Sequence, residues 1–557
     1  MKQLIECVPN FSEGRDPSVI RQITDEIQAV EGVQLLNVDP GKATNRTVVT
    51  FVGEPEAVVE AAFRAIKKAS EVIDMSHHTG EHPRMGATDV CPLVPIANIT
   101  MAETAEWARR LAEKVGIPLS IPVFLYEEAA TRPERRNLAT IRAGEYEGLK
   151  EKLQKPNWQP DFGPAVFNAK AGATVIGARD FLVAYNVNLN TTSVRRANSV
   201  AFDVREQGRV ILDEKGKKVL DESGEPKRLA GACKSVKGIG WFIEEYGIAQ
   251  VSMNLTNLRE TPLHIAFDEC CKSADRRGLR VTGSELVGLV PKQVLLDAGQ
   301  YFLKKQKRSA GVSEAELIKI AVRTFGLDEL APFDPQTRVI EYLLEDVKSA
   351  PLSKMTLKTF VDETASESPA PGGGSVAAYV GSLGVSLATM VANLSSHKKG
   401  WDDRWEVFSD VAEEGQRLKD ALLHKVDEDT AAFNAIMAAM SLPKSSESEK
   451  ILRKKAMSDA TKLAIEVPLS TMRLALESFS IIQKMVEIGN PNSVTDAGVG
   501  ALCVRAAVRG AYLNVKINTS GFEDKVYVEQ VLSEAEAILA KAEQLEAAAL
   551  KIVNEKI

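Results

Sequence analysis

Three of the six histidines in the chain lie in one short stretch, HHTGEHPRMGATD (77–89). His78 and His82 are four residues apart, the spacing that places two imidazoles on one face of a helix to bind zinc. Gly80 between them and Pro83 after them disfavour a continuous helix, because the residue before a proline is driven toward extended conformations. No third ligand stands at motif spacing, so we expect no metal in this stretch.

The same stretch is suited to proton transfer. Histidine titrates near neutral pH, and neighbouring carboxylates and guanidinium groups can shift its pKa or anchor a charged substrate. The alternative is a solvated surface turn, and the composition of the stretch does not separate the two.

A second candidate group is the carboxylate of Asp429 in VDEDTAAFNAIMAA (426–439). Asp429 completes an apolar stripe at helical spacing, whereas Asp427 and Glu428 point elsewhere. The stripe consists of Leu422, Val426, Phe433, Ile436 and Met440. Burying a carboxylate is costly unless it is paired or functional, and burial raises its pKa toward values that suit proton transfer. A structural buried aspartate is the alternative.

A glycine-rich turn, SPAPGGGSVAA (368–378), precedes a segment of small residues. Glycine permits backbone conformations closed to other residues, and the N-terminus of the following helix offers free N–H groups to an anion or a polar ring. The candidate binding residues here are Gly372, Gly373, Gly374 and Ser375. Tight helix packing is the alternative. No charged residue occurs from Ser368 to His397, a length that can span a bilayer, but its Gly, Ser and Asn content favours a buried bundle helix.

Two kinds of element must position these groups. Up to about residue 326, β-rich runs such as 46–53 and 247–257 alternate with helical periodicity such as 55–73 and 102–116, in two similar halves. After a proline-containing connector, almost every long segment has helical spacing. We therefore expect an α+β N-terminal part followed by an all-α helical bundle.

Residues 1 to about 326 resemble the formiminotransferase domain of the formiminotransferase-cyclodeaminase family of folate enzymes. The resemblance rests on CVPNFSEGR (7–15), DPGKATNRTVVTFVG (39–53), the histidine stretch and GATVIGARDFLVAYNVNL (172–189), in that order. It implies two ferredoxin-like α/β subdomains. It also implies that His82, in GEHPRMGA, is the acid/base of formimino transfer, in which N5 of tetrahydrofolate loses a proton and the departing glutamate nitrogen gains one. A group with a pKa near the working pH can do both.

The same resemblance implies further site residues. His77 and His78 are neighbours of His82 with a supporting role, and Asp39 and Arg84 are binders or orienters. The run GPAVFNAKAG matches the position of the folate-binding segment, although its middle departs from the usual composition; its residues are Gly163, Pro164, Ala165, Val166, Phe167, Asn168, Ala169, Lys170, Ala171 and Gly172. Lys42, Arg46 and Arg179 are candidates for holding glutamate carboxylates, and a surface charge is the alternative for each.

The C-terminal part resembles the cyclodeaminase domain of the same family, and is also similar to bacterial methenyltetrahydrofolate cyclohydrolases. The motifs are PAPGGGSVAA, LPK (442–444) and GNPNSVTDAGVGALCVRAAVRGAYLNVKIN (489–518), together with the stretch around Asp429. The resemblance implies that Asp429 passes a proton as 5-formiminotetrahydrofolate closes to 5,10-methenyltetrahydrofolate and ammonia leaves. Two alternatives stay open: a formyl-transferring variant with a cyclohydrolase domain, and a noncatalytic folate-binding scaffold.

The resemblance divides the chain into subdomains 1–181 and 182–326, a linker 327–352 and a helical domain 353–557. Its implied substrates are formiminoglutamate and tetrahydrofolate, with or without a polyglutamate tail, and it requires no metal or redox cofactor. A homo-oligomer, either a dimer or a dimer-based ring, is expected.

Composition limits the other classes of partner. The formal net charge of −7 disfavours nonspecific nucleic-acid binding. Six scattered cysteines without CxxC spacing suit free thiols, and the N-terminus has no apolar core of the kind found in a signal peptide. We therefore expect a cytoplasmic protein without a membrane span.

Overall fold

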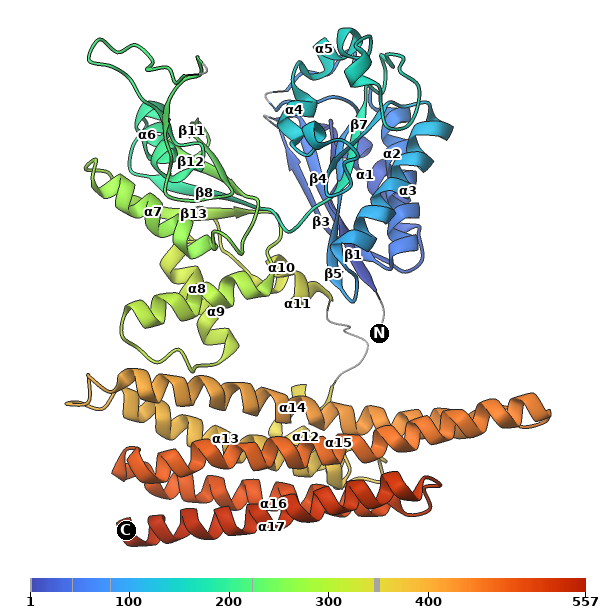
Figure 1. The fold of residues 1–557 in the computed structure, drawn as a ribbon, viewed down its shortest axis with the longest axis vertical. Coiled ribbons are helices and arrows are strands. Elements are labelled where there is room, and N and C mark those ends of the chain that lie inside the picture. The colour runs from blue at the N-terminus through green and yellow to red at the C-terminus, as the bar shows by residue number, and fades with distance from the viewer. Residues whose placement is uncertain (1–2, 43, 81, 223, 345–350) are drawn as a thin grey trace. The chain divides into compact units, whose positions relative to one another are not determined.

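The computed structural model describes the chain except for residues 1–2, 43, 81, 223 and 345–350, and the chain forms two compact units (Figure 1). Unit 1 comprises Met1–Val294 and Phe325–Leu344, and unit 2 comprises Leu295–Thr324 and Glu345–Ile557. Sheets dominate the first unit and long helices the second. The predicted α+β and all-α parts are thus confirmed.

The first half of unit 1 is built on a β-α-β-β-α-β plan. Its elements are β1 (Leu4–Cys7), β2 (Asn10–Phe11), α1 (Pro17–Gln28), β3 (Val33–Gly41), β4 (Arg46–Gly53), α2 (Pro55–Val72) and β5 (Thr88–Ala97). Strand β4 pairs with β3 and β1, and β1 pairs with β5, all antiparallel. The order β3-β4-β1-β5 is that of a ferredoxin-like sheet, as predicted.

Two further strands extend this sheet beyond β5. Strand β7 (Thr174–Ala178) pairs in parallel with β5 and with β6 (Val123–Glu127), and α3 (Met101–Leu119) connects β5 to β6. The predicted end of this helix at Gly116 is wrong: α3 continues to Leu119 with Pro118 in its last turn. Short helices follow β6: η1 (Pro133–Arg135), α4 (Leu138–Arg142), α5 (Glu145–Lys152) and η2 (Pro156–Trp158).

The two faces of this sheet have different surroundings. Helices α1, α2 and α3 pack against one face, and their core includes Ile5, Cys7 and Phe51 from the strands. On the opposite face a smaller core joins Val90, Tyr126 and Val175 to Ile141 and Leu149 of α4 and α5. The strand residues of this second face that these helices leave uncovered line the cavity described below.

The second half of unit 1 repeats the plan. Its elements are β8 (Val183–Leu189), α6 (Val194–Val204), β11 (Val236–Ile243), β12 (Ile248–Leu255), α7 (Leu263–Asp275) and β13 (Val281–Val287). The antiparallel order β11-β12-β8-β13 is again ferredoxin-like. A small two-stranded arm, β9 (Arg209–Val210) with β10 (Arg228–Leu229), lies between α6 and β11 in the sequence.

Unit 2 is helical. It contains most of α8 (Lys292–Lys305) and α9 (Glu314–Phe325), then η3 (Leu352–Lys354), α12 (Leu357–Thr364), α13 (Gly373–Ser396), α14 (Trp405–Ser441), α15 (Glu447–Ile488), η4 (Pro491–Ser493), α16 (Val494–Thr519) and α17 (Lys525–Lys556). The five long helices α13–α17 form a bundle (Figure 1). Helix α13 is the one helix in the described part of the chain that is long and apolar enough to cross a membrane, and 61% of its most apolar window is buried. It packs against α14 and α16, which confirms the predicted bundle helix.

The compact units do not follow the predicted boundary at residue 326. Residues 295–324 group with the helical unit, and Ser309 Oγ donates a hydrogen bond to Asn393 Oδ1 of α13 (2.7 Å). Residues 325–344, in the predicted linker, group with unit 1 and contain α10 (Pro335–Arg338) and α11 (Ile340–Leu344). Residues 345–350 of that linker lie outside the described residues.

Candidate active sites

A cavity of about 560 Å³ lies on the sheet face of unit 1 opposite α1–α3. Alternate strand residues line it: Glu6, Val8 and Asn10 from β1 to β2, Val48 and Thr50 from β4, and Val90 and Pro92 from β5. This alternation follows from the two-residue period of a strand, which sends Ile5 and Cys7 into the core under the helices. Residues of the second half, including Lys237 and Asn254, complete the wall.

His82 lines this cavity and is held at both ring nitrogens. Its Nδ1 is 2.7 Å from the carbonyl oxygen of Pro83, and its Nε2 is 2.7 Å from Arg46 Nη1. A carbonyl only accepts, and a guanidinium only donates. Nδ1 therefore carries the hydrogen, and the lone pair of Nε2 accepts from Arg46.

This arrangement lowers the pKa of His82 to about 3, through burial first and then through the positive charges of Arg46 and Arg142. The imidazole is thus neutral at neutral pH and is poised as a base. The pKa near the working pH that the sequence led us to expect is therefore not found for His82. A bound anion near Arg46 would shift the histidine pKa upward, because an opposite charge stabilises the imidazolium form.

The loop that carries His82 is fixed by the turn before β4. Asn45, in a left-handed conformation (φ 47°), donates from Nδ2 to Thr79 O, and its own carbonyl accepts from His78 Nε2 at 2.9 Å. Gly80 packs so closely that an added Cβ would lie 2.3 Å from Thr44 O. Around the undescribed residue 81, the loop is not helical, in line with the prediction from Gly80 and Pro83. His77 is exposed.

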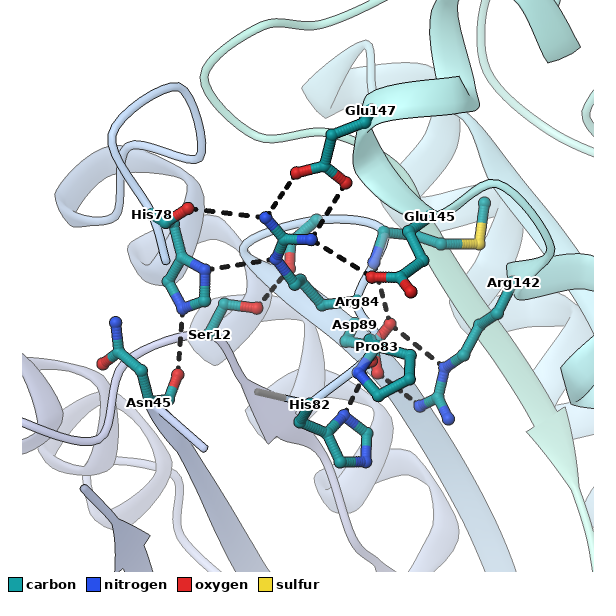
Figure 2. Close-up of polar contacts among 12 residues, drawn as sticks. Ser12, Asn45, His78, His82, Pro83, Arg84, Asp89, Arg142, Glu145 and Glu147 are labelled. Carbon is teal, nitrogen blue, oxygen red and sulfur yellow. Dashed lines mark hydrogen bonds and ion pairs between the residues drawn. The ribbon is translucent and has the colours of Figure 1, made fainter. Parts of the chain in front are cut away.

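Arg84 is occupied by protein partners (Figure 2). It forms ion pairs with Glu145 (3.2 Å) and Glu147 (2.6 Å), and its Nε donates to His78 Nδ1 at 3.3 Å. Of the two roles predicted for Arg84, the structure favours orienting the loop, since it lies outside the wall of the His82 cavity. Instead it lines a separate hollow with His78, Glu145 and Glu147.

Positive side chains gather in the His82 cavity. Arg46, Arg142, Arg179 and Lys237 line it, and so does the predicted Asp39, whose charge acts on Arg46. Arg142, at the end of α4, also pairs with the buried Asp89. The predicted candidate Lys42 is not among the lining residues.

The predicted folate-binding segment 163–172 forms a loop that the cavity wall does not include. Its end pairs with the chain just after the histidine loop, because Ala87 N donates to Ala171 O and Ala173 N donates to Met85 O. Tyr146 OH donates to Ala169 O, and Lys170 Nζ donates to Glu71 O. The segment is thus a neighbour of the histidine loop, and its contact with folate stays a prediction.

A second site lies in unit 2, where the N-terminus of α13 meets α14. Ser375 Oγ lies 3.0 Å from Asp429 Oδ2 and 3.0 Å from Val426 O, so its one proton is available to either acceptor. An added Cβ on Gly374 would lie 2.1 Å from Asp429 Oδ1, and one on Gly373 would lie 3.5 Å from Asn514 Nδ2 of α16. The predicted glycine turn and aspartate are therefore brought together, and Asn514 joins them.

Burial raises the pKa of Asp429, while hydrogen bonds from the side chain and backbone of Ser375 lower it. Asp427 instead accepts from Ser353 Oγ (2.5 Å), and Glu428 pairs with His424 and Lys425, so both point away as predicted. Of these three acids, the half-buried Asp429 is the one that contacts the glycine turn, and its pKa is raised.

The predicted stripe of α14 is wrong at Phe433 and Met440, whereas Ile436 is partly buried and packs against Ala432, as predicted. Phe433 is 38% exposed and Met440 is 50% exposed, whereas Ala432 and Ala439 are buried. Helix α13 begins beside Asp429, so the following turns of α14 face α15, where Ala432 packs with Ala464 and Val467. Because the packing partner of α14 changes from α13 to α15, a different face of α14 is buried in its later turns.

Sequence reasoning missed several residues that line the first cavity, namely Glu6, Tyr126, Arg142 and Lys237. Burial raises the pKa of Tyr126 to about 12, so it stays protonated. None of these residues stands in a local sequence pattern that indicates a site, and each becomes a candidate only because the fold brings it to the cavity.

Within the described residues, no group of three or more His, Cys, Asp or Glu side chains is arranged to hold a metal ion.

Comparison with known proteins finds matches along the whole chain. Family profiles match residues 4–179 (formiminotransferase domain, N-terminal subdomain), 184–345 (formiminotransferase domain) and 356–537 (formiminotransferase-cyclodeaminase). A formimidoyltransferase-cyclodeaminase of Dictyostelium discoideum is 42% identical over 558 residues, covering 100% of both chains.

Two shorter relatives each match one part of the chain. A glutamate formimidoyltransferase of Streptococcus pyogenes is 43% identical over 304 residues, which is 55% of this chain and 94% of the relative. A methenyltetrahydrofolate cyclohydrolase of Methylorubrum extorquens is 37% identical over 202 residues, which is 36% of this chain and 97% of the relative. The full-length match shows that the chain belongs to the formimidoyltransferase-cyclodeaminase family.

Proposed function

We propose that this chain is a bifunctional enzyme that transfers the formimino group of N-formimino-L-glutamate to tetrahydrofolate and then closes the product to 5,10-methenyltetrahydrofolate with release of ammonia. The observation that carries the proposal is the presence of two separate acid/base sites, His82 in unit 1 and Asp429 in unit 2, in a chain that matches the bifunctional relative from end to end. The substrates are formiminoglutamate and tetrahydrofolate, with or without a polyglutamate tail. Neither step needs a redox cofactor.

The first step uses the neutral imidazole of His82. Cations of the cavity bind the glutamate carboxylates, and a carboxylate that draws Arg46 away frees Nε2. N5 of tetrahydrofolate forms a bond to the formimino carbon and gives its proton to Nε2. The imidazolium returns that proton to the glutamate nitrogen as the carbon–nitrogen bond breaks, and glutamate leaves as an amine.

The second step uses the carboxylate of Asp429. N10 of 5-formiminotetrahydrofolate forms a bond to the formimino carbon and gives its proton to the carboxylate. Asp429 then passes the proton to the formimino nitrogen, which leaves as ammonia, and the methenyl product forms. Burial raises the aspartate pKa, which makes it a better proton acceptor than an exposed aspartate.

The function is tested by supplying formiminoglutamate and tetrahydrofolate and following methenyltetrahydrofolate by absorbance and ammonia by a coupled assay. We expect both products in equal amounts. A second candidate, favoured by the cyclohydrolase relative, is a cyclohydrolase domain with formyl transfer. That candidate predicts no ammonia with formiminoglutamate and transfer from N-formylglutamate instead, and a noncatalytic scaffold predicts neither product.

Gly374→Ala is expected to impair the second step selectively. The new Cβ would lie 2.1 Å from Asp429 Oδ1, so the carboxylate must move. A displacement of about 1 Å lowers a catalysed rate by roughly 100-fold. The measurement is ammonia release from supplied 5-formiminotetrahydrofolate. Gly372→Ala, whose Cβ would meet no atom within 4 Å, is the steric comparison and should lose much less.

We further propose a cytoplasmic homo-oligomer, either a dimer or a dimer-based ring. The six cysteines are free thiols, which supports a reducing compartment. Apolar side chains are exposed around the turn between α14 and α15, which supports contact with a second chain; they include Phe433, Met437, Met440, Ile451 and Leu452. We propose neither a nucleic-acid partner nor a membrane span.

A further inference from the structure

Glu6 is a buried acid that the mechanism above does not use. It lies on β1, is 4% exposed, and lines the same cavity as His82. Its carboxylate makes no hydrogen bond or ion pair with any residue in the described part of the chain. Other buried acids in unit 1 are paired: Asp89 binds Arg142, and Asp161 binds Arg135.

An unpaired buried carboxylate is destabilising unless a ligand completes it. Burial raises the pKa of Glu6 to about 7, while the charge of Arg179 lowers it and that of Glu341 on α11 raises it. A carboxyl group with this pKa is about half ionised at neutral pH. A cation placed beside it would lower its pKa and favour the carboxylate form. Glu6 is therefore a buried acid that a cationic group of a ligand could pair with.

The charges of the cavity match one donor better than its isostere. Formiminoglutamate carries two carboxylates and one planar amidinium cation, and N-formylglutamate carries the same carboxylates with a neutral amide. Arg46, Arg142, Arg179 and Lys237 supply positive partners for the carboxylates. Three other carboxylates lie near these cations. Asp39 acts on Arg46 and is half exposed, Asp89 pairs with Arg142, and Glu145 pairs with Arg84. Glu6 remains as the buried partner for a cation.

We propose that Glu6 binds the amidinium of the donor and makes the site select formimino over formyl donors. The inference rests on the proposed function and names the specificity residue of its first step. A planar amidinium offers two parallel N–H donors to a carboxylate, as a guanidinium does. A neutral formamide leaves the carboxylate buried and unpaired, and that unmade interaction is the source of the discrimination.

The test is Glu6→Gln, which keeps the shape and removes the charge. Binding of each donor is measured by calorimetry without folate, and kcat and KM are then measured with tetrahydrofolate. We expect affinity for formiminoglutamate to fall by about 10- to 100-fold, with KM changed more than kcat, and affinity for N-formylglutamate to stay level or improve. Glu6→Asp should recover part of the preference. Glu113→Gln, an exposed acid on α3, should leave both donors unaffected.

The pH dependence gives a second readout. Below about pH 7, Glu6 binds a proton that the amidinium must displace, so KM for formiminoglutamate should rise as pH falls in the native protein and stay flat in Glu6→Gln. The pKa of His82 is about 3, that of Arg46 is about 10 and that of Tyr126 is about 12, so none of these three groups titrates near pH 7 in the structure. The cavity is also faced by Asp39, Glu145, Arg142, Arg179 and Lys237, which both proteins share, so the comparison with Glu6→Gln isolates the contribution of Glu6.

Each outcome bears on one claim. Equal losses for both donors, or no loss for either, would overturn the role of Glu6 and leave the proposed function intact. A native protein that binds formiminoglutamate through Glu6 but transfers nothing would refute the proposed function and leave the binding role standing. Native binding without preference between the donors would overturn the inference.

Discussion

His82→Ala lowers the rate of formimino transfer by ~10²- to 10⁴-fold, the range that a positioned acid/base contributes. Among the described residues that line the cavity, His82 is the one histidine, and Arg46, which now donates to Nε2, has no lone pair with which to replace it. The measurement is the steady-state kcat for glutamate release from formiminoglutamate and tetrahydrofolate. Ammonia release from supplied 5-formiminotetrahydrofolate should be unchanged, because Asp429 is in the other unit.

The matched control is His77→Ala. His77 belongs to the same loop but is exposed, so its loss should change kcat by less than about threefold, as for a surface substitution. If His82→Ala retained transfer within a few-fold of the native rate, the cavity would need another base, and the role given to His82 would be wrong.

Asp429→Asn is expected to reduce ammonia release by ~10²- to 10⁴-fold while formimino transfer continues. The amide keeps the size of the side chain and its contact with Ser375 but cannot accept the N10 proton. The intermediate 5-formiminotetrahydrofolate should therefore accumulate, which chromatography of a quenched reaction detects. Mixing this variant with His82→Ala should restore the methenyl product, since each supplies the site that the other lacks.

Glu428→Gln is the control for Asp429→Asn. It removes a neighbouring negative charge from the same turn, but this acid pairs with His424 and Lys425 on the surface. Its ammonia release should match the native rate. Equal losses of ammonia release in both variants would show that this rate depends on the negative charge of α14 and not on the carboxylate of Asp429 in particular.

Much of the architecture was predictable because periodicity reports local structure directly. The β-rich composition of 46–53 predicted a strand, and helical spacing placed Asp429 toward its neighbours. Periodicity does not report which helix packs against each turn. The apolar stripe therefore predicted the wrong buried residue at Phe433, where the packing partner of α14 changes from α13 to α15. The helix end predicted at Gly116 is also wrong, and α3 ends at Leu119 instead.

The candidate sites were predictable to different degrees. His82 and Asp429 carry local signals, a dense polar loop and an acid in an apolar stripe. Glu6 carries none, since one acid on an alternating strand also describes a strand with a solvated face. Its burial depends on residues as distant as Lys237 and Asn254, which complete the cavity wall. Arg142 likewise has no local signal, because a cation at a helix end is common. Its place in the site follows from its ion pair with Asp89 and its position in the cavity wall.

The two sites should also differ in how they respond to heat. The Asp429 site is made by side chains of packed helices, with Gly374 in direct contact with the carboxylate, so it cannot deform without separating α13 from α14. The His82 site depends on a nonhelical loop tied down by Asn45 and Arg84, and such loops open locally at lower free energy than a bundle core. On gradual warming, transfer should therefore fail while cyclisation persists, and the chain would pass through a range in which it is a single-function enzyme.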